Sequence, residues 1–499
     1  MLFSRRRAAA VGLVAAAAAA GLATLGEACD YTLEAKASLR FNIETDRLYL
    51  EGGGCITPSD IYLAKLTNVT EDDGNTLTAE EAAAIPITPI TKDGEFSDAE
   101  TGYWLFTSDV YIYDGVKLEL HAESGTTGMR LKSDSKVIEL RAHGGWLSLL
   151  NTELSSWDVD EADYASNYSA PRSYVTAISE VLDSPPQTCV GHAKNDAGEA
   201  RFDIINSEVH HLGHYGTEAY GITWKVRGFC VDLSNEDLFD RVNVRGDIRF
   251  SDIHHNYFGM YTYGHQDGLW EYNLMHENAK YGFDPHDDSD NLRIHNNIVW
   301  DNGDHGIIAS KRCNDVSIQN NVVYDNANAG IMLHRSSDHA IVRNNTVSGS
   351  GDACIAIFES MEGDYSNNKC TDNKYGFRWS VGASHNKIYD NEVYDSQQYG
   401  IYMYEGSDLP YVSDGLPSYN IIANNIIDTA TEGIKMGDTV GNEFTGNVIT
   451  NTADLRFRNS SEVIWKDNDI PAGVDIDSEG SCFTSDSDIV QLGEEAIVC

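Results

Sequence analysis

HNNIVWDNGDHGIIAS, residues 295–310, is one copy of a unit that recurs along the second half of the chain. The next copies read QNNVVYDNANAGIMLH at 319–334 and RNNTVSGSGDACIAIF at 343–358. In each copy an asparagine pair precedes a short apolar run, and a Gly or Cys follows the second asparagine by nine residues. A period of about 22 to 24 residues with asparagine at the corners predicts an all-β chain, a right-handed parallel β-helix.

The same repeat predicts the direction of each side chain. Counted from the Gly, the first and third positions are mostly apolar and are expected to face the core. The second and fourth positions must then face outward, because side chains alternate along a strand. These outward rows contain Lys225, Tyr261, Tyr263, Asp284, His286, His334, Arg378, Tyr402 and Tyr404. The residues one position further leave the strand, and they include Asp287, Lys311 and Arg335.

The net charge restricts the classes of partner. The chain carries 35 Lys+Arg against 78 Asp+Glu, a formal net charge of -43. This balance argues against nucleic-acid binding and fits an extracellular protein. A polyanionic substrate would need a local basic surface, and the outward rows collect cations beside aromatic side chains. Aromatic rings also pair well with the apolar faces of sugars.

Residues 281–290, YGFDPHDDSD, are the predicted chemical centre. Asp284 and His286 are expected to share one exposed face, about 6.6 Å apart along the strand, with neighbours from adjacent turns about 4.8 Å away. A cation placed against the carboxylate of an acidic sugar would lower the cost of removing the neighbouring proton. A histidine or tyrosine can then move that proton. Returning it to the opposite face inverts the carbon, whereas expelling the 4-linked sugar makes the enzyme a lyase.

Two parts of this stretch have other interpretations. Asp287, Asp288 and Asp290 are typical of a turn, or of a calcium site. No specific calcium motif is present, so we expect no required cofactor and keep calcium as the alternative. Tyr281 precedes a Gly at a position that other repeats fill with an aromatic residue, so packing at the start of the strand is its alternative role.

The ends of the chain predict export and capping. Residues 1–28 have three arginines before an Ala-rich apolar run, which predicts a cleaved secretory signal peptide, with a signal anchor as the alternative. Short apolar runs such as Leu48–Leu50 and Ile61–Leu63 predict a β-rich cap over 29–109. The catalytic β-helix is expected over 110–470 and a terminal segment over 471–499. The nine cysteines form no CxxC pair, and their odd number leaves at least one unpaired. N-glycosylation sequons begin at Asn68, Asn167, Asn344 and Asn459.

Two motifs resemble one enzyme family. YGFDPHD at 281–287 is similar to the signature of mannuronan C5-epimerases, and HGIIASKR at 305–312 resembles the next turn of the periplasmic bacterial branch. AYGITW at 219–224 and FGMYTY at 258–263 also look similar, and the cysteines and sequons resemble the brown-algal branch. The resemblance covers roughly residues 110–460. It implies a secreted or periplasmic monomer that converts β-D-mannuronate to α-L-guluronate within alginate.

The resemblance also implies roles for single residues. His286 resembles the catalytic base, and Asp284 its acidic partner. Tyr281 is similar to a tyrosine with an acid/base role in the secreted bacterial branch, whereas the periplasmic branch uses water. The cation that binds the substrate carboxylate falls on Lys311 or Arg312. The planar fork of arginine favours Arg312 as a catalytic residue, and the register favours Lys311.

Three functions therefore remain open. The leading hypothesis is a mannuronan C5-epimerase whose substrate contacts include the outward rows together with Asp287, Lys311 and Arg335. A polyuronate lyase on the same fold is the enzymatic alternative. A carbohydrate-binding β-helix without activity is the third.

Overall fold

The structure is a computed structural model that describes most of the chain. The described residues are 37–67, 79–180, 198–228, 238–239, 242–429, 431–492 and 497–499. The predicted signal peptide, Cys29, Cys189, Cys230 and the sequon at Asn68 lie outside them. By its internal contacts the chain divides into two compact units, Met1–Ala279 and Lys280–Cys499.

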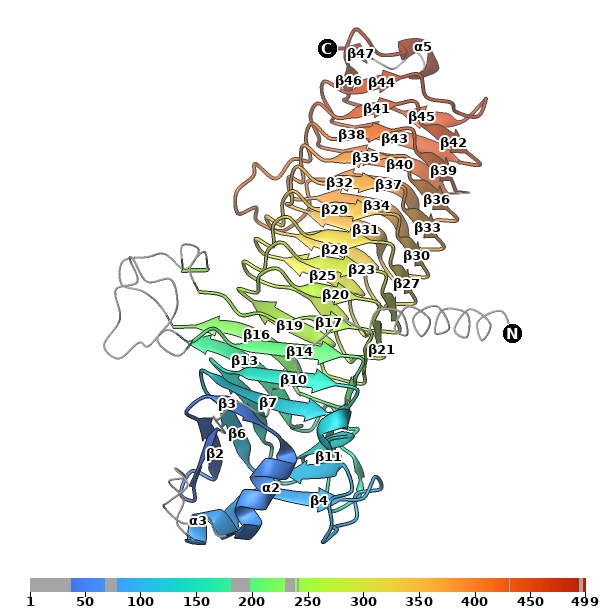
Figure 1. Ribbon diagram of the computed structural model, residues 1–499. Coiled ribbons are helices and arrows are strands. Elements are labelled where there is room, and N and C mark those ends of the chain that lie inside the picture. Colours follow the sequence, from blue (N-terminus) through green and yellow to red (C-terminus); the bar gives the residue numbers. More distant parts are fainter. Residues whose placement is uncertain are drawn as a thin grey trace. The chain divides into compact units, whose positions relative to one another are not determined.

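The first unit begins with a hairpin and two short helices (Figure 1). The elements are β1 (Ser38–Asn42), β2 (Arg47–Glu51), β3 (Gly54–Ile56), α2 (Pro58–Thr67), α3 (Ala79–Ala84) and β4 (Ile87–Ile90). The prediction that Ile61–Leu63 forms a strand is wrong, because these residues lie in α2. The helix begins at a capping box, in which the Asp60 carboxylate accepts from the Thr57 N–H at 3.0 Å and Thr57 Oγ1 accepts from the Asp60 N–H at 3.2 Å. Proline at the first helical position strengthens this start.

Parallel strands build the rest of the first unit. One sheet continues from β1 and β2 through β6 (Asp109–Ile112), β9 (Glu139–His143), β13 (Tyr174–Glu180), β16 (Ile222–Arg227) and β19 (Met260–Tyr263). A second runs from β3 through β7 (Val116–His121), β10 (Trp146–Leu150), β14 (Arg201–Ile205), β17 (Ile248–Arg249) and β20 (Leu269–Glu271). A third runs from β4 through β5 (Tyr103–Phe106), β8 (Gly128–Lys132), β11 (Glu153–Asp158), β15 (Glu208–His210), β18 (Asp252–His254) and β21 (Leu274–His276). The turn η3 (Ala122–Ser124) follows β7, and β12 (Asp163–Tyr164) pairs with β11.

The second unit repeats the same plan with one strand per sheet in each turn. The first sheet contains β22 (Phe283–Asp284), β25 (Ile307–Ser310), β28 (Ile331–His334), β31 (Ala353–Phe358), β34 (Tyr375–Ser380), β37 (Tyr399–Tyr404), β40 (Glu432–Gly437), β43 (Asp454–Arg458) and β45 (Asp475–Asp477). The second contains β23 (Arg293–His295), β26 (Ser317–Gln319), β29 (Ile341–Arg343), β32 (Asp364–Ser366), β35 (Lys387–Tyr389), β38 (Ile421–Ala423), β41 (Glu443–Thr445) and β44 (Ile464–Lys466). The third contains β24 (Ile298–Trp300), β27 (Val322–Tyr324), β30 (Thr346–Ser348), β33 (Lys369–Thr371), β36 (Glu392–Tyr394), β39 (Ile426–Asp428) and β42 (Val448–Thr450). The chain ends with β46 (Cys482–Phe483), α5 (Ile489–Leu492) and β47 (Ile497–Val498).

The strand pairing confirms the predicted fold and its register. Phe283 pairs with Ile307, Ile307 with Ile331, and Ile331 with Ile355. All four side chains are fully buried. The position after each Gly, or after Cys354, therefore faces the core of a right-handed parallel β-helix, as the repeat predicts.

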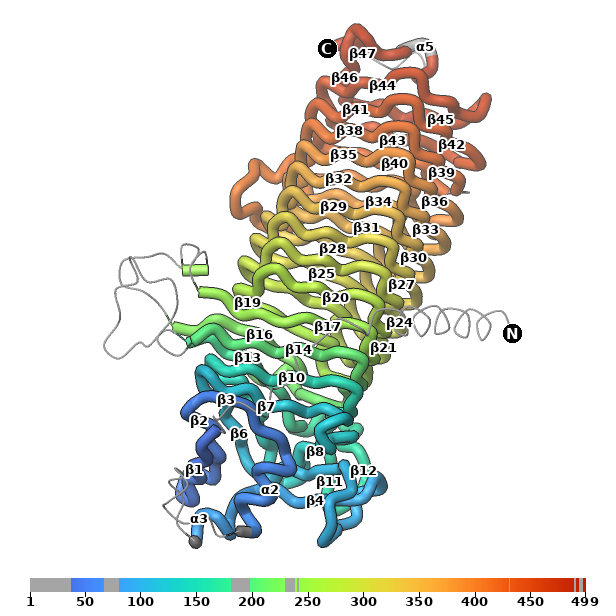
Figure 2. The backbone as a smooth tube through the Cα atoms, viewed as in Figure 1, coloured from blue at the N-terminus to red at the C-terminus, as the bar shows by residue number. Residues whose placement is uncertain are grey.

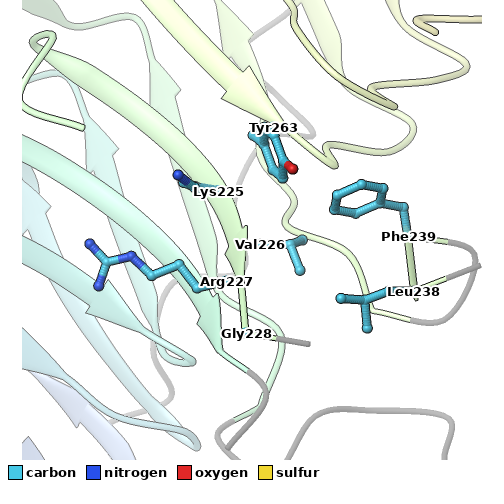
Figure 3. Close-up of a pocket in the computed structure, with 7 residues that line it drawn as sticks. All are labelled: Lys225, Val226, Arg227, Gly228, Leu238, Phe239 and Tyr263. Atoms are coloured by element: carbon cyan, nitrogen blue, oxygen red, sulfur yellow. The ribbon is translucent and has the colours of Figure 1, made fainter. Parts of the chain in front are cut away.

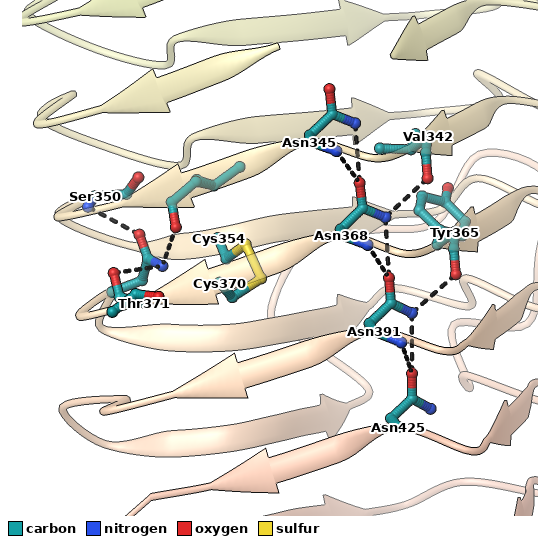
Figure 4. Close-up of a disulfide and its surroundings, with 12 residues drawn as sticks. Val342, Asn345, Ser350, Cys354, Tyr365, Asn368, Cys370, Thr371, Asn391 and Asn425 are labelled. Carbon is teal, nitrogen blue, oxygen red and sulfur yellow. Dashed lines mark hydrogen bonds between the residues drawn. A yellow bond between two sulfur atoms is a disulfide. The ribbon is translucent and has the colours of Figure 1, made fainter. Parts of the chain in front are cut away.

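An asparagine ladder holds successive turns together (Figure 4). Asn345, Asn368 and Asn391 are almost fully buried, and each side chain bonds to the next turn. The Asn368 side-chain oxygen accepts the backbone and side-chain N–H groups of Asn345 at 3.0 and 2.9 Å. Its amide donates to Asn391 at 3.0 Å and to the Val342 carbonyl at 2.8 Å. The repeated asparagine thus satisfies backbone groups that the corner would otherwise leave unpaired.

Asn368→Ala is expected to lower the free energy of unfolding by about 2–5 kcal/mol, because several buried groups lose their partners together. Urea unfolding measures the change. Gln398→Ala removes an exposed amide elsewhere in the second unit and should stay within about 0.5 kcal/mol of the wild type. Equal stability of the two variants would contradict a supporting role for the ladder.

Cysteines cross-link the second unit at two places. Cys354 on β31 bonds to Cys370 on β33 within one turn (Figure 4), and Cys482 bonds to Cys499. Cys313 is buried and free, which agrees with the odd cysteine count. Among the described residues, no helix has both the length and the apolar character needed to cross a membrane.

Candidate active site

The candidate site lies where β22, β25 and β28 end in tight turns. Each turn begins with two residues in the left-handed backbone region, such as Asp287 and Asp288 (φ 33° and 53°) or Lys311 and Arg312 (both 61°). Backbone hydrogen bonds stack the turns, from the Asp287 N–H to the Ser310 carbonyl at 2.9 Å and from the Asp288 N–H to the Lys311 carbonyl at 3.1 Å. Side chains one period apart therefore lie directly beside each other.

A continuous network joins His286 to Arg312. Nδ1 of His286 bonds to Oδ2 of Asp287, whose other oxygen accepts from Arg312 at 3.2 Å. Arg312 also bonds to Asp288, through Nε at 3.1 Å and Nη2 at 2.9 Å. Burial alone would raise the pKa of Asp287, but the His286 hydrogen bond and the charges of Lys311 and Arg312 lower it. A carboxylate only accepts, so Nδ1 of His286 carries the proton and Nε2 is the basic nitrogen.

Asp284 is buried, with 3 % of its surface exposed, so the prediction that it lies on an exposed face is wrong. The alternation itself holds, but the outward row is largely apolar beyond Asp284, and its residues Ile308, Met332 and Ala356 belong to an apolar cluster. That cluster consists of Ile308, Ala329, Met332, Ala353, Ala356, Phe358, Tyr375 and Val381. Burial raises the pKa of Asp284 to about 7, with Asp304 and Asp287 adding to the rise and His286 and Lys311 opposing it. This carboxyl is therefore partly protonated near neutral pH.

Tyr281 packs at the start of β22. Its ring stacks on His305, with centroids 5.8 Å apart and planes 9° from parallel, and it contacts the apolar cluster. Nδ1 of His305 accepts the Ala329 N–H at 3.1 Å, and burial lowers the pKa of His305. Tyr281 is thus held beside a neutral histidine, close in sequence to Asp284 and His286.

The predicted basic surface is smaller than the outward rows imply. Arg378 pairs with Asp352 at 2.8 Å, and Arg312 is bonded to two carboxylates. Nδ1 of His334 shares a hydrogen bond with the Ser310 hydroxyl at 2.8 Å, and burial together with the charges of Arg335 and His286 lowers the pKa of His334 to about 3. His334 is therefore neutral at physiological pH and cannot serve as an anion-binding cation.

Lys311 differs from Arg312 and Arg378 in its ion pairing. Within the part of the chain that the structure describes, its ammonium forms no ion pair, while its charge acts on both Asp284 and Asp287. Its turn lies directly beside that of Asp288, as the backbone hydrogen bond shows. The register interpretation that favours Lys311 thus fits the local electrostatics better than the preference for Arg312.

Aromatic side chains continue along the same sheet. Tyr402 and Tyr404 on β37 stack with centroids 4.3 Å apart. Burial, together with the neighbouring tyrosines, raises the pKa of Tyr402 to about 12. Tyr402 therefore keeps its proton and can offer a hydrogen bond and a ring face, but no base.

Three predicted substrate contacts belong to the first unit. Lys225 and Tyr263 line a pocket of about 210 Å³ together with Leu238 and Phe239 (Figure 3). Lys225 pairs with Glu218 at 2.9 Å and lies 5.1 Å from the Tyr263 ring centre. Tyr261 contacts the Tyr220 ring, with centroids 5.0 Å apart.

Asp288 is a site residue that the sequence interpretation assigned to a turn. Asp288 is the main partner of Arg312. The sequence could have predicted this contact, because the two residues are 24 positions apart, which is one period of the repeat. Asp290 accepts the Asn314 N–H at 2.6 Å. No group of three or more His, Cys, Asp or Glu side chains among the described residues is arranged to hold a metal ion. The expectation that no cofactor is required, with calcium as the alternative, stays a prediction.

The fold and this cluster define a β-helix protein with an acid, a histidine and cations at the edge of one sheet. A family model described as "Right handed beta helix region" matches residues 192–347 and 308–489, which together exceed half of the chain. The chain belongs to this right-handed β-helix family. A search of curated protein sequences gave no match.

Solved structures share the fold at low sequence identity. The periplasmic alginate epimerase AlgG is 17 % identical, with a TM-score of 0.59 over 88 % of this chain and 85 % of that one. A doubly substituted AlgG is 18 % identical, with a TM-score of 0.61 over 78 % and 82 %. The A-module of the mannuronan C-5 epimerase AlgE4 from Azotobacter vinelandii is 17 % identical over 77 % and 90 %, with a TM-score of 0.36. The likeness to AlgG shows the fold.

Proposed function

We propose that the protein is a polysaccharide C5-epimerase that converts β-D-mannuronate to α-L-guluronate within alginate. The observation that carries the proposal is the network from His286 through Asp287 to Arg312, set beside the buried Asp284 and the cation Lys311. The motif at 281–287 and the shared fold with alginate epimerases support the same chemistry. The substrate is polymannuronate, and the enzyme acts as a monomer outside the cytoplasm, in the periplasm if bacterial.

His286 begins the proposed reaction as the general base. Its Nε2 takes the C5 proton, and the C–H electron pair moves into the bond to the carboxylate carbon, which gives an enolate. Asp287 stabilises the resulting imidazolium, and Arg312 holds Asp287 in place. Arg312 is therefore a positioning residue in this proposal, and it does not bind the substrate carboxylate.

Lys311 and Asp284 stabilise the enolate. Lys311 supplies the positive charge against the substrate carboxylate, since Arg312 is committed to two protein carboxylates. Protonated Asp284 offers a neutral hydrogen-bond donor in a dry environment, where such bonds are strong. Tyr281 or a water molecule returns a proton to the opposite face of C5, and this completes the inversion.

Incubation with polymannuronate in ordinary water tests the proposal. Proton NMR detects new guluronate, and ultraviolet absorbance detects unsaturated chain ends. We expect guluronate without a rise in absorbance. Unsaturated ends would indicate β-elimination by a lyase, and binding without either product would indicate a carbohydrate-binding β-helix.

A further inference from the structure

An insertion after β37 folds back over earlier turns of the second unit. Residues 406–417 lie between the end of β37 at Tyr404 and the start of β38 at Ile421, and they form the orange excursion in Figure 2. Oε1 of Glu359 accepts the backbone N–H groups of Tyr411, of Val412 at 2.9 Å and of Ser413 at 3.3 Å. These three hydrogen bonds are called the Glu359 clasp below. Glu359 is completely buried, so the clasp leaves this part of the insertion little room to move.

Arg335 forms a second anchor for the insertion. Its Nη1 donates to the Leu409 carbonyl at 3.2 Å, and its guanidinium lies 3.8 Å from the Tyr411 ring centre. On the other side it lies 5.1 Å from the ring centre of Phe358. Arg335 was predicted to bind substrate directly, but the structure places it between two aromatic rings. Its guanidinium also pairs with Glu359 at 3.6 Å and with Asp408 of the insertion at 3.9 Å, so it links the insertion to the sheet.

The tip of the insertion lies beside the candidate site. Arg312 donates its backbone N–H to the Arg335 carbonyl at 3.0 Å, so Arg335 belongs to the turn next to Lys311 and Arg312. Adjacent parallel strands lie about 4.8 Å apart. The two anchors thus hold the tip of the insertion toward the His286 end of the sheet and away from the level of β37, where the insertion starts.

The tip exposes apolar surface that the fold leaves uncovered. Leu409 is 83 % exposed, Val412 67 % and Tyr411 65 %. One face of the Tyr411 ring rests on Arg335, and much of the rest of the side chain is open to solvent. A ring backed by a cation and held by a buried clasp presents a rigid flat surface, which suits the apolar CH face of a sugar ring.

We propose that residues 406–417 form a sugar-binding arm, in which Tyr411 stacks on a uronate ring of the polymer beyond the reacting sugar. Glu359 is a positioning residue, because it touches the backbone of the arm and holds Tyr411 in register. The uronate class of the ligand rests on the proposed function. Short oligomers that do not reach the arm gain nothing from it.

Affinity electrophoresis in gels that contain polymannuronate tests the arm. Tyr411→Ala should raise the dissociation constant for the polymer about 5- to 10-fold, the effect of losing one aromatic contact. Its affinity for a mannuronate trimer should be unchanged. Tyr419→Ala is the matched control, since Tyr419 is 49 % exposed and stacks on His385 before β38. This control should bind like the wild type.

Hydrogen exchange of the backbone amides distinguishes a positioning role of Glu359 from direct contact between Glu359 and the sugar. Glu359→Ala should accelerate exchange of the amides of residues 411–413 and weaken polymer binding as Tyr411→Ala does, whereas Glu359→Gln, which keeps an acceptor oxygen, should restore much of both. Unchanged amide exchange in Glu359→Ala would overturn the positioning role.

Equal polymer binding by Tyr411→Ala and the wild type would overturn the arm, and a wild type that does not bind polymannuronate would overturn its sugar assignment. A wild type that binds through Tyr411 but forms no guluronate would instead contradict the proposed function and leave the arm standing.

Discussion

His286→Ala is expected to lower the rate of guluronate formation by about a thousandfold, the usual contribution of a general base. The reason is the arrangement around the ring: Asp287 fixes the proton on Nδ1, and Arg312 fixes Asp287. Asp287 and Arg312 are hydrogen-bonded to each other, so neither replaces the imidazole as the base. The initial rate is measured by proton NMR with polymannuronate at saturation, so that kcat is read separately from KM.

His339→Asn is the control for this prediction. His339 is also in the second unit, is about half exposed and pairs with Glu362 at 3.2 Å. Its backbone is left-handed (φ 57°), which asparagine tolerates. Both variants should unfold at temperatures close to that of the wild type. If His286→Ala keeps more than a tenth of the wild-type kcat, His286 is not the base.

Asp284→Asn is expected to change stability in a pH-dependent way. Burial raises the pKa of Asp284 from its usual 3.8 to about 7, so the folded state favours the protonated carboxyl. The protonated carboxyl of Asp284 therefore contributes to the free energy of unfolding of the wild type. This contribution is fully present below about pH 4 and is lost as the pH rises through 7. The full difference is about 4 kcal/mol, at about 1.4 kcal/mol per pKa unit. The amide of the Asp284→Asn variant does not titrate, so the variant does not lose stability in this way.

Urea unfolding at pH 4 and pH 8 measures this difference. The variant should gain several kcal/mol relative to the wild type between the two pH values, and catalysis should respond in the same range. If the protonated carboxyl donates to the substrate, the wild-type kcat/KM falls above pH 7, and Asp284→Asn loses that fall. A stability difference that is the same at pH 4 and pH 8 would show that Asp284 is ionised in the folded protein.

The repeat was enough to predict the fold and the register. Ile307 and Ile331 occupy equivalent positions because stacking forces identical periods to coincide, and the pairing follows that rule. The motif at 281–287 was likewise enough to bring His286 and Asp287 to the end of a strand. These features are local or periodic, so a single sequence contains them.

Contacts between distant segments were beyond the sequence pattern. Arg335 meets Leu409 across 74 residues, and nothing in the period indicates where an insertion folds. Asp284 is buried although it lies on an outward row, because alternation predicts only the direction of a side chain and not how far it is covered. The row of turn residues did hold one signal, since the acid Glu359 follows the cations Lys311 and Arg335, and its carboxylate binds the backbone of the arm.

Incorporation of deuterium at C5 follows the fate of the proton that His286 is proposed to remove. Wild-type protein is incubated with polymannuronate in heavy water, and the products are examined by NMR and mass spectrometry. We expect every new guluronate residue to carry deuterium at C5, because the proton that His286 removes is replaced from solvent on the opposite face. Guluronate that forms without deuterium, or a polymer that exchanges no C5 proton at all, would contradict it.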